Sequence, residues 1–342
     1  MATELVLEVV DLKKYFDTGG QFTRGGTVYA VDGVSFTIGS GEMLGLVGES
    51  GSGKTTVGSC IMRLLEPTEG TIRLKGRDIT HLSRRELRPF RREMHMVFQD
   101  PYSSLNPRMT CGDIVAEPIR VQKLVRRSLV QKRVIELFDA VGLRPELRFR
   151  YPHELSGGQR QRVGLARSLS VSPSLLIADE PVSALDVSVQ AAILNLLRDL
   201  QQDMHFSCLF ITHDLATVEY LCDRVAVMYL GQLVEVASRE QLFTEPKHPY
   251  TQALLSAAVV ADPEIQRSGR RIVLEGDIPS PLAPPSGCRF RTRCPLEPQS
   301  APQSHDEEPP LIDVGDGHLV ACHLARRGAE VPVLIDVPAE LA

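Results

Sequence analysis

One eight-residue segment limits the folds open to this chain more than any other feature. Residues 48–55 read GESGSGKT and follow an apolar, strand-length run at residues 43–47. A glycine-rich loop between a strand and a helix is typical of phosphate binding, because its backbone N–H groups and the positive end of the helix surround phosphate oxygens. The order strand, loop, helix argues against a chance glycine-rich turn. The segment therefore predicts an α/β unit that binds a nucleotide.

The positions of this loop have different expected tasks. Lys54 supplies a positive point charge, and Thr55 supplies a hydroxyl ligand for Mg²⁺. The residues expected to contact the bound nucleotide are Gly48, Glu49, Ser50, Gly51, Ser52, Gly53, Lys54, Thr55 and Thr56.

A second apolar run ends in two acids. Residues 175–180 read LLIADE. Asp179 is expected to hold Mg²⁺ through water, and Glu180 to orient or deprotonate the attacking water. The alternative is a pair of solvated acids after a core strand, which the phosphate loop makes less plausible. Together the two motifs predict hydrolysis of the terminal phosphate rather than its transfer to a small molecule.

The base of the nucleotide is expected to be adenine. The usual guanine reader, Asn-Lys-x-Asp, is absent because the only asparagines, Asn106 and Asn195, do not precede lysine. Adenine stacks on aromatic rings, and Tyr15 is the candidate ring, with Phe16 as the runner-up. Ordinary packing of Tyr15 is the alternative. The expected ligands are thus ATP and Mg²⁺.

The rest of the chain predicts three regions. Strand-length apolar runs at residues 43–47, 94–98, 175–178 and 208–211 are separated by helical patterns, which is typical of a mostly parallel α/β sheet. Strand signals vanish in a helical subdomain at about residues 101–171. Nine prolines between positions 279 and 310 prevent long helices. We therefore expect an ATPase domain at residues 1–260 and a loop-rich extension at residues 261–342.

Bulk properties narrow the function further. The apolar fraction is 43%, the charged fraction is 24% and the net charge is -5, which favours a soluble globular protein without general affinity for nucleic acid. No run reaches the roughly 18 apolar residues of a membrane-spanning helix, and acids replace the basic start of an export signal. We expect a cytoplasmic chain whose cysteines stay reduced.

A third motif indicates the family. Residues 155–159 read LSGGQ, between the phosphate loop and the acidic strand, and a helix-forming run follows at residues 160–169. With the other two motifs, this resembles the signature of ABC transporter ATPases. The resemblance implies a parallel-sheet core, an antiparallel β subdomain and an inserted helical subdomain.

The resemblance also assigns further residues. Gln99 matches the Q-loop, beside Mg²⁺ and the reacting water, and Asp186 in residues 183–186 matches the D-loop. His213 matches the switch histidine, which implies contact with the terminal phosphate. In this family the signature crosses a dimer to the partner's nucleotide, so the residues that would make that contact here are Ser156, Gly157, Gly158 and Gln159.

Longer matches point to one branch of the family. Residues 97–107 and 248–254 resemble bacterial dipeptide and oligopeptide importers, and residues 11–16 and 151–154 resemble their second, F-type ATPase. This implies import of dipeptides or oligopeptides from the cytoplasmic face of the inner membrane. The implied partners are a second ATPase subunit, expected to be a different D-type chain, two membrane permeases and, indirectly, an extracytoplasmic peptide-binding protein.

Other functions of the same motifs fit the chain less well or differ only in the solute. The same architecture serves importers of nickel or glutathione, and the solute is chosen by other chains. A DNA-repair or chromosome ATPase would carry a long coiled coil between loop and signature, but no sustained heptads occur here. A translation-associated ATPase would contain two cassettes, and each motif occurs once in this chain.

Three cysteines of the extension form a separate candidate site. Cys288, Cys294 and Cys322 resemble the cysteine motif that holds a [4Fe-4S] cluster in some relatives. A fourth cysteine is missing, and Ser304 and His305 stand near its place. A cluster with His305 or another fourth ligand, zinc bound by three cysteines and a histidine, and free thiols all stay open. The other cysteines are expected to be packing residues: Cys60, Cys111, Cys208 and Cys222.

Overall fold

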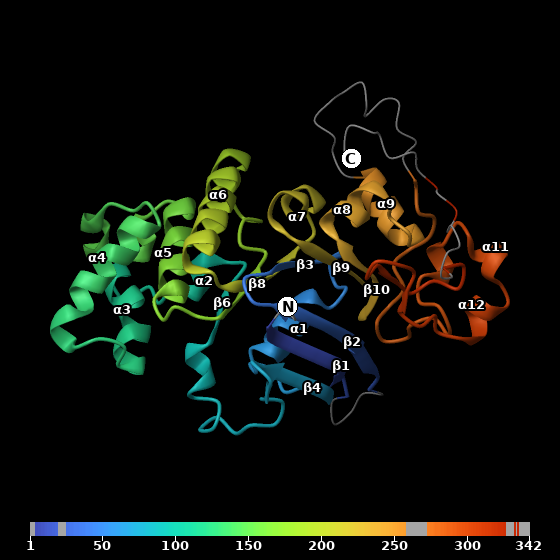
Figure 1. The fold of residues 1–342 in the computed structure, drawn as a ribbon, viewed down its shortest axis with the longest axis horizontal. Helices are drawn as coiled ribbons and strands as arrows, with labels where there is room; N and C mark the ends of the chain where they lie inside the picture. The colour runs from blue at the N-terminus through green and yellow to red at the C-terminus, as the bar shows by residue number, and fades with distance from the viewer. Residues whose placement is uncertain (1–3, 20–24, 258–271, 326–331, 333, 335–342) are drawn as a thin grey trace. The chain divides into compact units, whose positions relative to one another are not determined.

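The computed structural model describes residues 4–19, 25–257, 272–325, 332 and 334 (Figure 1). The chain divides into two compact units that alternate along the sequence. The first contains Met1–Glu8, Thr37–Met43 and Arg73–Ile211, and the second contains Val9–Phe36, Leu44–Ile72 and Thr212–Ala342. The predicted boundary between residues 260 and 261 lies outside the described residues.

The first unit contains a parallel sheet. Strand β7 (Leu175–Asp179) pairs in parallel with β6 (Met94–Val97) on one side and with β8 (Ser207–Thr212) on the other. Every residue of β7 is buried. A strand that is covered on both faces has a continuous apolar sequence instead of an alternating one. This is why the continuous apolar runs correctly predicted these strands. The predicted parallel α/β core is confirmed.

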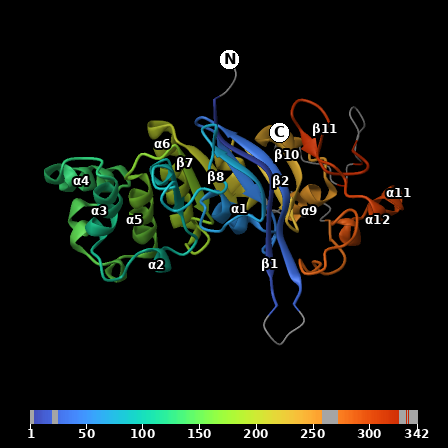
Figure 2. The ribbon, with the colours of Figure 1, turned by 90° about the horizontal axis from the view of Figure 1, so that it is seen from below.

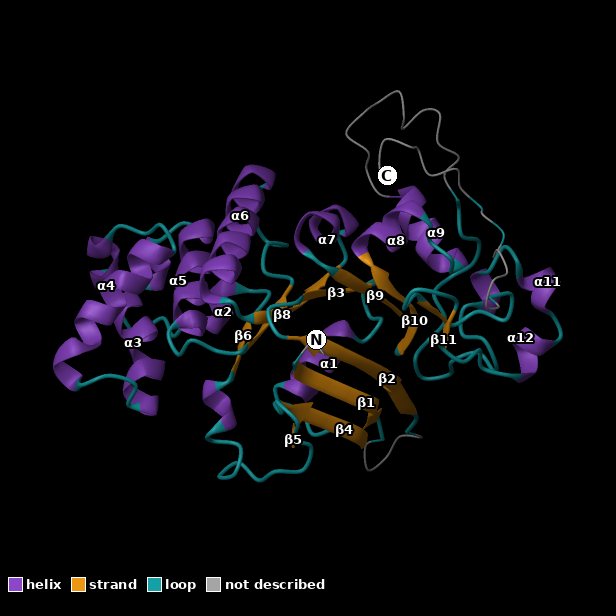
Figure 3. Cartoon of the chain, viewed as in Figure 1, coloured by secondary structure: helices purple, strands orange, loops and turns teal. Residues whose placement is uncertain are grey.

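Helices fill the stretch between β6 and β7. They are α2 (Pro101–Ser104), α3 (Cys111–Gln122), α4 (Val130–Ala140) and α5 (Gly157–Leu169), with short 3₁₀ turns at Arg127–Leu129, Pro145–Phe149 and Pro152–Glu154. Figure 3 shows this region as helix and loop. Thr110 caps α3 by accepting the backbone N–H of Asp113, and α3 packs on both α4 and α5. The predicted helical character of this stretch is confirmed, and its helices belong to the same compact unit as β6 and β7. The first unit also holds a 3₁₀ turn at Phe90–Arg92 and helix α6 (Val187–Met204).

In the second unit a mixed sheet continues into the extension. Strand β9 (Arg224–Tyr229) pairs in parallel with β3 (Met43–Val47) and antiparallel with β10 (Gln232–Ser238). Strand β12 (Leu319–Val320) adds to β10 with Glu235 opposite Val320, and β11 (Ile312–Asp313) adds to β12. The extension has no strand signal at the level of sequence, because two-residue strands are too short for any periodicity.

The remaining elements of the second unit are mostly short. Helices α1 (Lys54–Ile61), α7 (Leu215–Leu221), α8 (Arg239–Thr244) and α9 (Pro249–Ala257) precede the extension, which contains a 3₁₀ turn at Arg291–Arg293 and helices α11 (Glu297–Ser300) and α12 (Gln303–Asp306). The short helices agree with the many prolines there. Strands β1 (Leu5–Asp17) and β2 (Thr27–Gly39) are long and run side by side (Figure 2). They belong to a sheet with β4 (Glu69–Leu74), whose end pairs antiparallel with β5 (Arg77–Asp78).

A buried carboxylate fastens the extension to the sheet of the second unit. Glu235 of β10 has no exposed surface and accepts the backbone N–H groups of Lys247 at 2.7 Å and His248 at 2.9 Å. Its other hydrogen bond, at 2.6 Å, joins it to Nε2 of His318 in the extension. Because a buried charge is costly unless it is hydrogen-bonded, these three partners hold two segments, residues 247–248 and the extension at His318, against the side chain of Glu235 in β10.

Among the described helices, none has the length and apolar character required to cross a bilayer.

The packing of α7 on β3 gives a stability prediction. A Cβ atom at Gly45 would lie 2.8 Å from Cγ1 of Val218 and 3.1 Å from Sγ of Cys222. We expect Gly45→Ala to lower the free energy of unfolding by about 1–3 kcal/mol, because overpacking forces α7 away from the sheet. The urea midpoint followed by circular dichroism measures the change.

Gly164→Ala in α5 is the matched control. No heavy atom lies within 4 Å of a Cβ placed there. Removing a glycine from a helix interior should raise the free energy of unfolding by roughly 0.5–1 kcal/mol. A Gly45→Ala midpoint at or above that of the parent chain would contradict the packing argument.

Candidate nucleotide-binding and hydrolysis site

The phosphate loop connects β3 to α1 and has a conformation that only glycine permits at two points. Gly48 and Gly53 have φ of 155° and 105°. A Cβ atom would lie 2.1 Å from the carbonyl oxygen of Met228 at the first position and 2.1 Å from that of Ala30 at the second. Both contacts are with rigid backbone, so no larger residue fits.

Lysine and backbone hydrogen bonds stabilise the curled loop. The Nζ atom of Lys54 donates to the carbonyl oxygens of Gly48 at 2.8 Å and Glu49 at 2.9 Å, and the residue is only 5% exposed. The N–H of Glu49 donates to the hydroxyl of Tyr250, and the carbonyl of Ser52 accepts the N–H of Gly231. The charge of Lys54 is therefore held inside the loop that the sequence assigned to phosphate.

The side chain of Glu49 faces the extension. Its two carboxylate oxygens accept hydrogen bonds from Arg293 at 2.8 and 3.1 Å. These residues are 244 positions apart, and no local sequence signal connects them.

Tyr15 is also tied to a residue that sequence reasoning missed. Its hydroxyl donates to Oδ1 of Asp32 at 2.5 Å, and its ring meets that of Tyr29 edge to face with centroids 4.9 Å apart. Burial and the hydrogen bond to Asp32 raise the pKa of Tyr15, so the phenol stays neutral. The runner-up ring, Phe16, lies under the ammonium group of Lys14 at 4.9 Å.

His213 lies directly after β8 and is exposed. The next residue, Asp214, caps α7 by accepting the N–H of Ala216 at 3.0 Å.

In the first unit, Gln99 and Glu180 meet. Nε2 of Gln99 donates to Oε2 of Glu180 at 2.8 Å, and the N–H of Glu180 donates to the carbonyl of Ile211 at 2.9 Å. Glu180 has a φ of 44°, in the left-handed region, which costs a residue with a Cβ roughly 1–2 kcal/mol. Asp179, the last residue of β7, is 3% exposed. The strained turn directs Glu180 toward Gln99 instead of continuing the strand.

The signature residues begin helix α5. Ser156 is its N-cap and forms a capping box with Gln159: Ser156 Oγ accepts the N–H of Gln159, and Gln159 Oε1 accepts the N–H of Ser156. A Cβ atom at Gly157 would lie tightly against Leu185, at 3.1 Å, and one at Gly158 would clash with Val189, at 2.6 Å. Helix α5 therefore packs closely against the start of α6.

Asp186 is the N-cap residue of α6. Its side chain makes no capping hydrogen bond, while its carbonyl oxygen accepts the N–H groups of Val189 at 2.9 Å and Gln190 at 2.8 Å. The predicted ATP-site residues thus form two groups. The phosphate loop, Tyr15 and His213 belong to the second unit, and the signature, Gln99, Asp179, Glu180 and Asp186 belong to the first.

The three cysteines of the extension are near one another but are not gathered into a ligand set. Burial raises the pKa of all three thiols, to about 12 for Cys294, and a thiolate at Cys322 would add to the rise at Cys288 and Cys294. Nε2 of His305 is bonded to Glu297 at 2.5 Å. Within the described ranges, no three His, Cys, Asp or Glu side chains are close enough to hold a metal ion. The thiols fit a cluster in type and neighbourhood, while the arrangement of this structure does not form a coordination shell.

The four remaining cysteines are buried, as predicted. Cys60, Cys111 and Cys208 have no exposed surface, and Cys222 is 1% exposed. Burial raises the pKa of Cys60 and Cys111 to about 11 and that of Cys208 to about 12, so these thiols stay protonated.

Two family models match the chain. The one described as "ABC transporter" matches residues 31–183, and the one described as "Oligopeptide/dipeptide transporter, C-terminal region" matches residues 234–300. The first spans the phosphate loop, the signature and the acidic strand. The second covers residues 234–238 of β10, the whole of α9 and the segment that carries Arg289 and Arg293.

Similar curated proteins match over most of their length. The "Putative oligopeptide transport ATP-binding protein YkfD" of Bacillus subtilis (strain 168) is 50% identical over 322 residues, 94% of this chain and 96% of the relative. The "Probable peptide ABC transporter ATP-binding protein y4tS" of Sinorhizobium fredii is 50% identical over 99% of this chain and 96% of the relative. The "Oligopeptide transport ATP-binding protein AppF" of Bacillus subtilis is 49% identical over 94% and 98%.

Solved structures share the fold. A structure of cbiO1 from Clostridium perfringens, described as part of the ABC transporter complex cbiONQ, has a TM-score of 0.62 and 28% identity over 71% of this chain and 92% of its own. The ATP-binding cassette MJ0796, in a dimeric post-hydrolysis state bound to ADP and Pi, has a TM-score of 0.62 and 28% identity over 68% and 98%. With its motifs, its fold and these relatives, the chain belongs to the ATP-binding, ATP-hydrolysing proteins of the oligopeptide and dipeptide ABC transporter family.

Proposed function

We propose that this chain is the F-type ATPase subunit that powers import of dipeptides or oligopeptides across the bacterial inner membrane. The names of its 50% identical relatives support peptide as the solute. Its domains would be an ATPase domain at residues 1–260, with the helical subdomain at about 101–171, and the extension at residues 261–342.

The catalytic assignment rests on one observation, the Gln99–Glu180 hydrogen bond at a strained backbone position. Glu180 would accept a proton from the attacking water, and Gln99 would hold that carboxylate in place. His213 would contact the terminal phosphate. Thr55, Gln99 and Asp179 would hold Mg²⁺, which neutralises phosphate charge when bound. Lys54 would exchange its loop carbonyls for phosphate oxygens.

A dimer is proposed to complete the site. The N-terminus of α5 offers a positive helix end at Ser156, Gly157 and Gly158, suited to the terminal phosphate on a partner. The similar cassette MJ0796 is described as dimeric after hydrolysis, which supports this arrangement. Gln159 would act by capping the helix, and Asp186 would lie at the dimer contact.

Transport requires further chains. We propose a D-type ATPase partner and two permeases, with the chain bound peripherally to them at the cytoplasmic face of the inner membrane. A peptide-binding protein outside the membrane would deliver the solute. The family of the relatives supports permease partners, since an ATP-binding protein of a transporter acts through a membrane path.

Glu180→Gln tests the assigned base. The amide cannot take a proton, so phosphate release should fall by about 10²–10⁴-fold. Gln keeps the size of Glu, so ATP affinity measured by calorimetry should not change. Glu117→Gln, at an exposed position of α3, is the control and should hydrolyse ATP like the parent chain. Undiminished hydrolysis by Glu180→Gln would refute the assignment.

Tyr15→Ala tests the adenine platform. Losing a stacked ring should weaken ATP binding by roughly 1–3 kcal/mol, roughly 5- to 150-fold. Tyr15→Phe keeps the ring and should lose less affinity than Tyr15→Ala in the same calorimetric titration. Phe16→Ala serves as the comparison. If Phe16→Ala weakens binding and Tyr15→Ala does not, the runner-up is the platform.

We further propose that Cys288, Cys294 and Cys322 ligate a [4Fe-4S] cluster with a fourth, non-cysteine ligand. Cys294 and Cys322 both pack against the buried cluster of Leu296, Val320 and Ala325, which supports a common site. Protein purified without oxygen should contain iron and acid-labile sulfide, and Cys294→Ser should lose both. Zinc in their place, or neither metal, would overturn the cluster.

A further inference from the structure

We propose that the extension is a working part of the ATP site, with Arg293 and Arg289 as positioning residues. Arg293 would neutralise and fix Glu49 of the phosphate loop, and Arg289 would fix Tyr15 through Asp32. This inference rests on the proposed nucleotide contacts of residues 48–56 and Tyr15.

The Arg293–Glu49 pair has the geometry of a strong ion pair. Both guanidinium NH groups donate, at 2.8 and 3.1 Å to the two oxygens of one carboxylate, and the Arg293 side chain is 8% exposed while Glu49 is 27% exposed. A planar fork that grips both oxygens fixes direction as well as distance. Burial is the largest single influence and by itself would lower the pKa of Arg293, but the hydrogen bonds and charges of Glu49 and Tyr229 together outweigh it, and the pKa is raised.

The pair matters for ATP because of where Glu49 lies. It is the second residue of the phosphate loop, next to Gly48, and its own carbonyl accepts Lys54. An unpaired carboxylate at this place would repel a polyphosphate, since like charges in a partly buried region are weakly screened. Arg293 removes that repulsion. The N–H of Glu49 is held as well, by the hydroxyl of Tyr250, so the residue is fixed on several sides.

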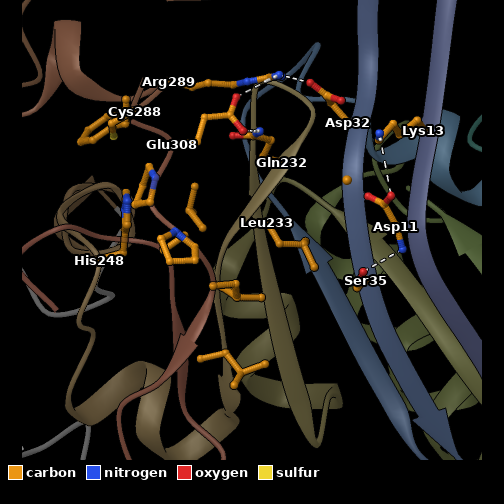
Figure 4. Close-up of a pocket in the computed structure, with 18 residues that line it drawn as sticks. Asp11, Lys13, Asp32, Ser35, Gln232, Leu233, His248, Cys288, Arg289 and Glu308 are labelled. Atoms are coloured by element: carbon orange, nitrogen blue, oxygen red, sulfur yellow. Dashed lines mark hydrogen bonds and ion pairs between the residues drawn. The ribbon is translucent and has the colours of Figure 1, made fainter. Parts of the chain in front are cut away.

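Arg289 reaches the other end of the proposed site. It is 6% exposed and forms an ion pair with Asp32, the same carboxylate that accepts the hydroxyl of Tyr15. Figure 4 shows Arg289 pointing toward Asp32 at the edge of a cavity of about 640 Å³, with Glu308 beside it. Glu308 in turn accepts a hydrogen bond from Gln232 at 3.1 Å.

A second connection runs from Arg289 to the loop itself. Its NH1 group donates to the carbonyl of Leu230, in the β9–β10 turn. The next residue, Gly231, donates its N–H to the carbonyl of Ser52 at 2.9 Å and accepts the N–H of Asp32 at 2.8 Å. One turn therefore joins the arginine, the phosphate loop and the Tyr15 partner.

A buried ring fixes the segment that carries both arginines. Phe290 is 2% exposed and packs against Tyr229, Tyr250 and His248, with ring centroids 5.2, 5.4 and 5.6 Å away. Tyr250 is the residue whose hydroxyl accepts the N–H of Glu49. The two arginines thus lie on either side of a buried ring that is connected to the phosphate loop through Tyr250, so both side chains start from a fixed backbone.

The competing explanation is that these pairs only fasten the extension to the rest of the chain. If the pair only attaches the extension, removing either partner should change ATP affinity by the same amount, and removing both should restore none of it. If Arg293 acts by neutralising Glu49, removing both side chains should restore ATP affinity, because the loss in Arg293→Ala comes from the carboxylate that is left unpaired.

The experiment measures ATP affinity of the full chain by calorimetry, with urea midpoints to verify folding. Arg293→Ala should weaken ATP binding by about tenfold, the effect of a nearby unpaired charge. Adding Glu49→Gln to Arg293→Ala should bring the dissociation constant back to within about threefold of the parent value. Arg293→Met, which keeps the apolar stem of the side chain, replaces Arg293→Ala if the latter unfolds.

Arg291→Ala is the matched control, because it removes the same charge from the same turn. Arg291 donates to the carbonyl of Ser286 at 2.9 Å, away from Glu49 and Asp32 in the hydrogen-bond network, so affinity should not change. For the second arginine, Arg289→Ala should weaken ATP binding in the parent chain and have a smaller effect in Tyr15→Phe, which lacks the hydroxyl that Asp32 holds.

Two results would overturn the proposal. One is an unchanged ATP affinity in the folded Arg293→Ala or Arg293→Met variant. The other is a double variant, with Glu49→Gln added, that binds ATP as weakly as the single Arg293 variant. Failure of the underlying site is distinguishable. If Lys54→Ala also leaves ATP affinity unchanged, the proposed phosphate loop is wrong. If Lys54→Ala weakens ATP binding while Arg293→Ala binds ATP like the parent chain, only the role of the extension is rejected.

Discussion

The backbone of the phosphate loop is in close contact with two other chain segments, so its conformation depends on where those segments lie. Gly48 lies against the carbonyl of Met228 in β9, and Gly53 against that of Ala30 in β2. A curl that exposes N–H groups to an anion must direct its carbonyls elsewhere, and here they go to Lys54 and to the N–H of Gly231. Any displacement of β2, β9 or the β9–β10 turn would therefore move the groups proposed to bind phosphate.

The extension is part of this arrangement. It contributes β12 to the sheet, a histidine to the buried carboxylate of Glu235, and Phe290 to the aromatic cluster under the loop. A proline-rich segment with few long elements cannot build a large core of its own, so it gains order by packing on the sheet. Two of its arginines then meet carboxylates that belong to the nucleotide-binding part of the chain.

In the first unit, the polar residues of the proposed site are held by hydrogen bonds within that unit. The capping box of Ser156 and Gln159 satisfies the helix end internally, so the fold of the signature does not depend on a bound nucleotide. Glu180, by contrast, is kept in a left-handed conformation by the hydrogen bonds of its N–H and carbonyl groups to Ile211 and Ser183. Strain maintained by surrounding structure is common where a side chain must face a reacting group.

The local motifs were readable from the sequence because their chemistry and their geometry are set by neighbouring residues. The strand, the glycines at 48 and 53 and Lys54 form one continuous segment, and the same holds for the acids that end β7 and the cap that starts α5. Family resemblance identified Gln99 as a further site residue, and in the structure its side chain donates a hydrogen bond to Glu180.

Contacts between distant segments depended on the tertiary structure. Glu49 and Arg293 are 244 residues apart, Asp32 and Arg289 are 257 apart, and each looks like an ordinary charged residue in its own sequence context. The strand β12 is two residues long, too short to show a pattern. Spacing and composition describe what a segment does with its neighbours, whereas only the packing of Phe290, Tyr229 and Tyr250 decides which distant charges are brought together.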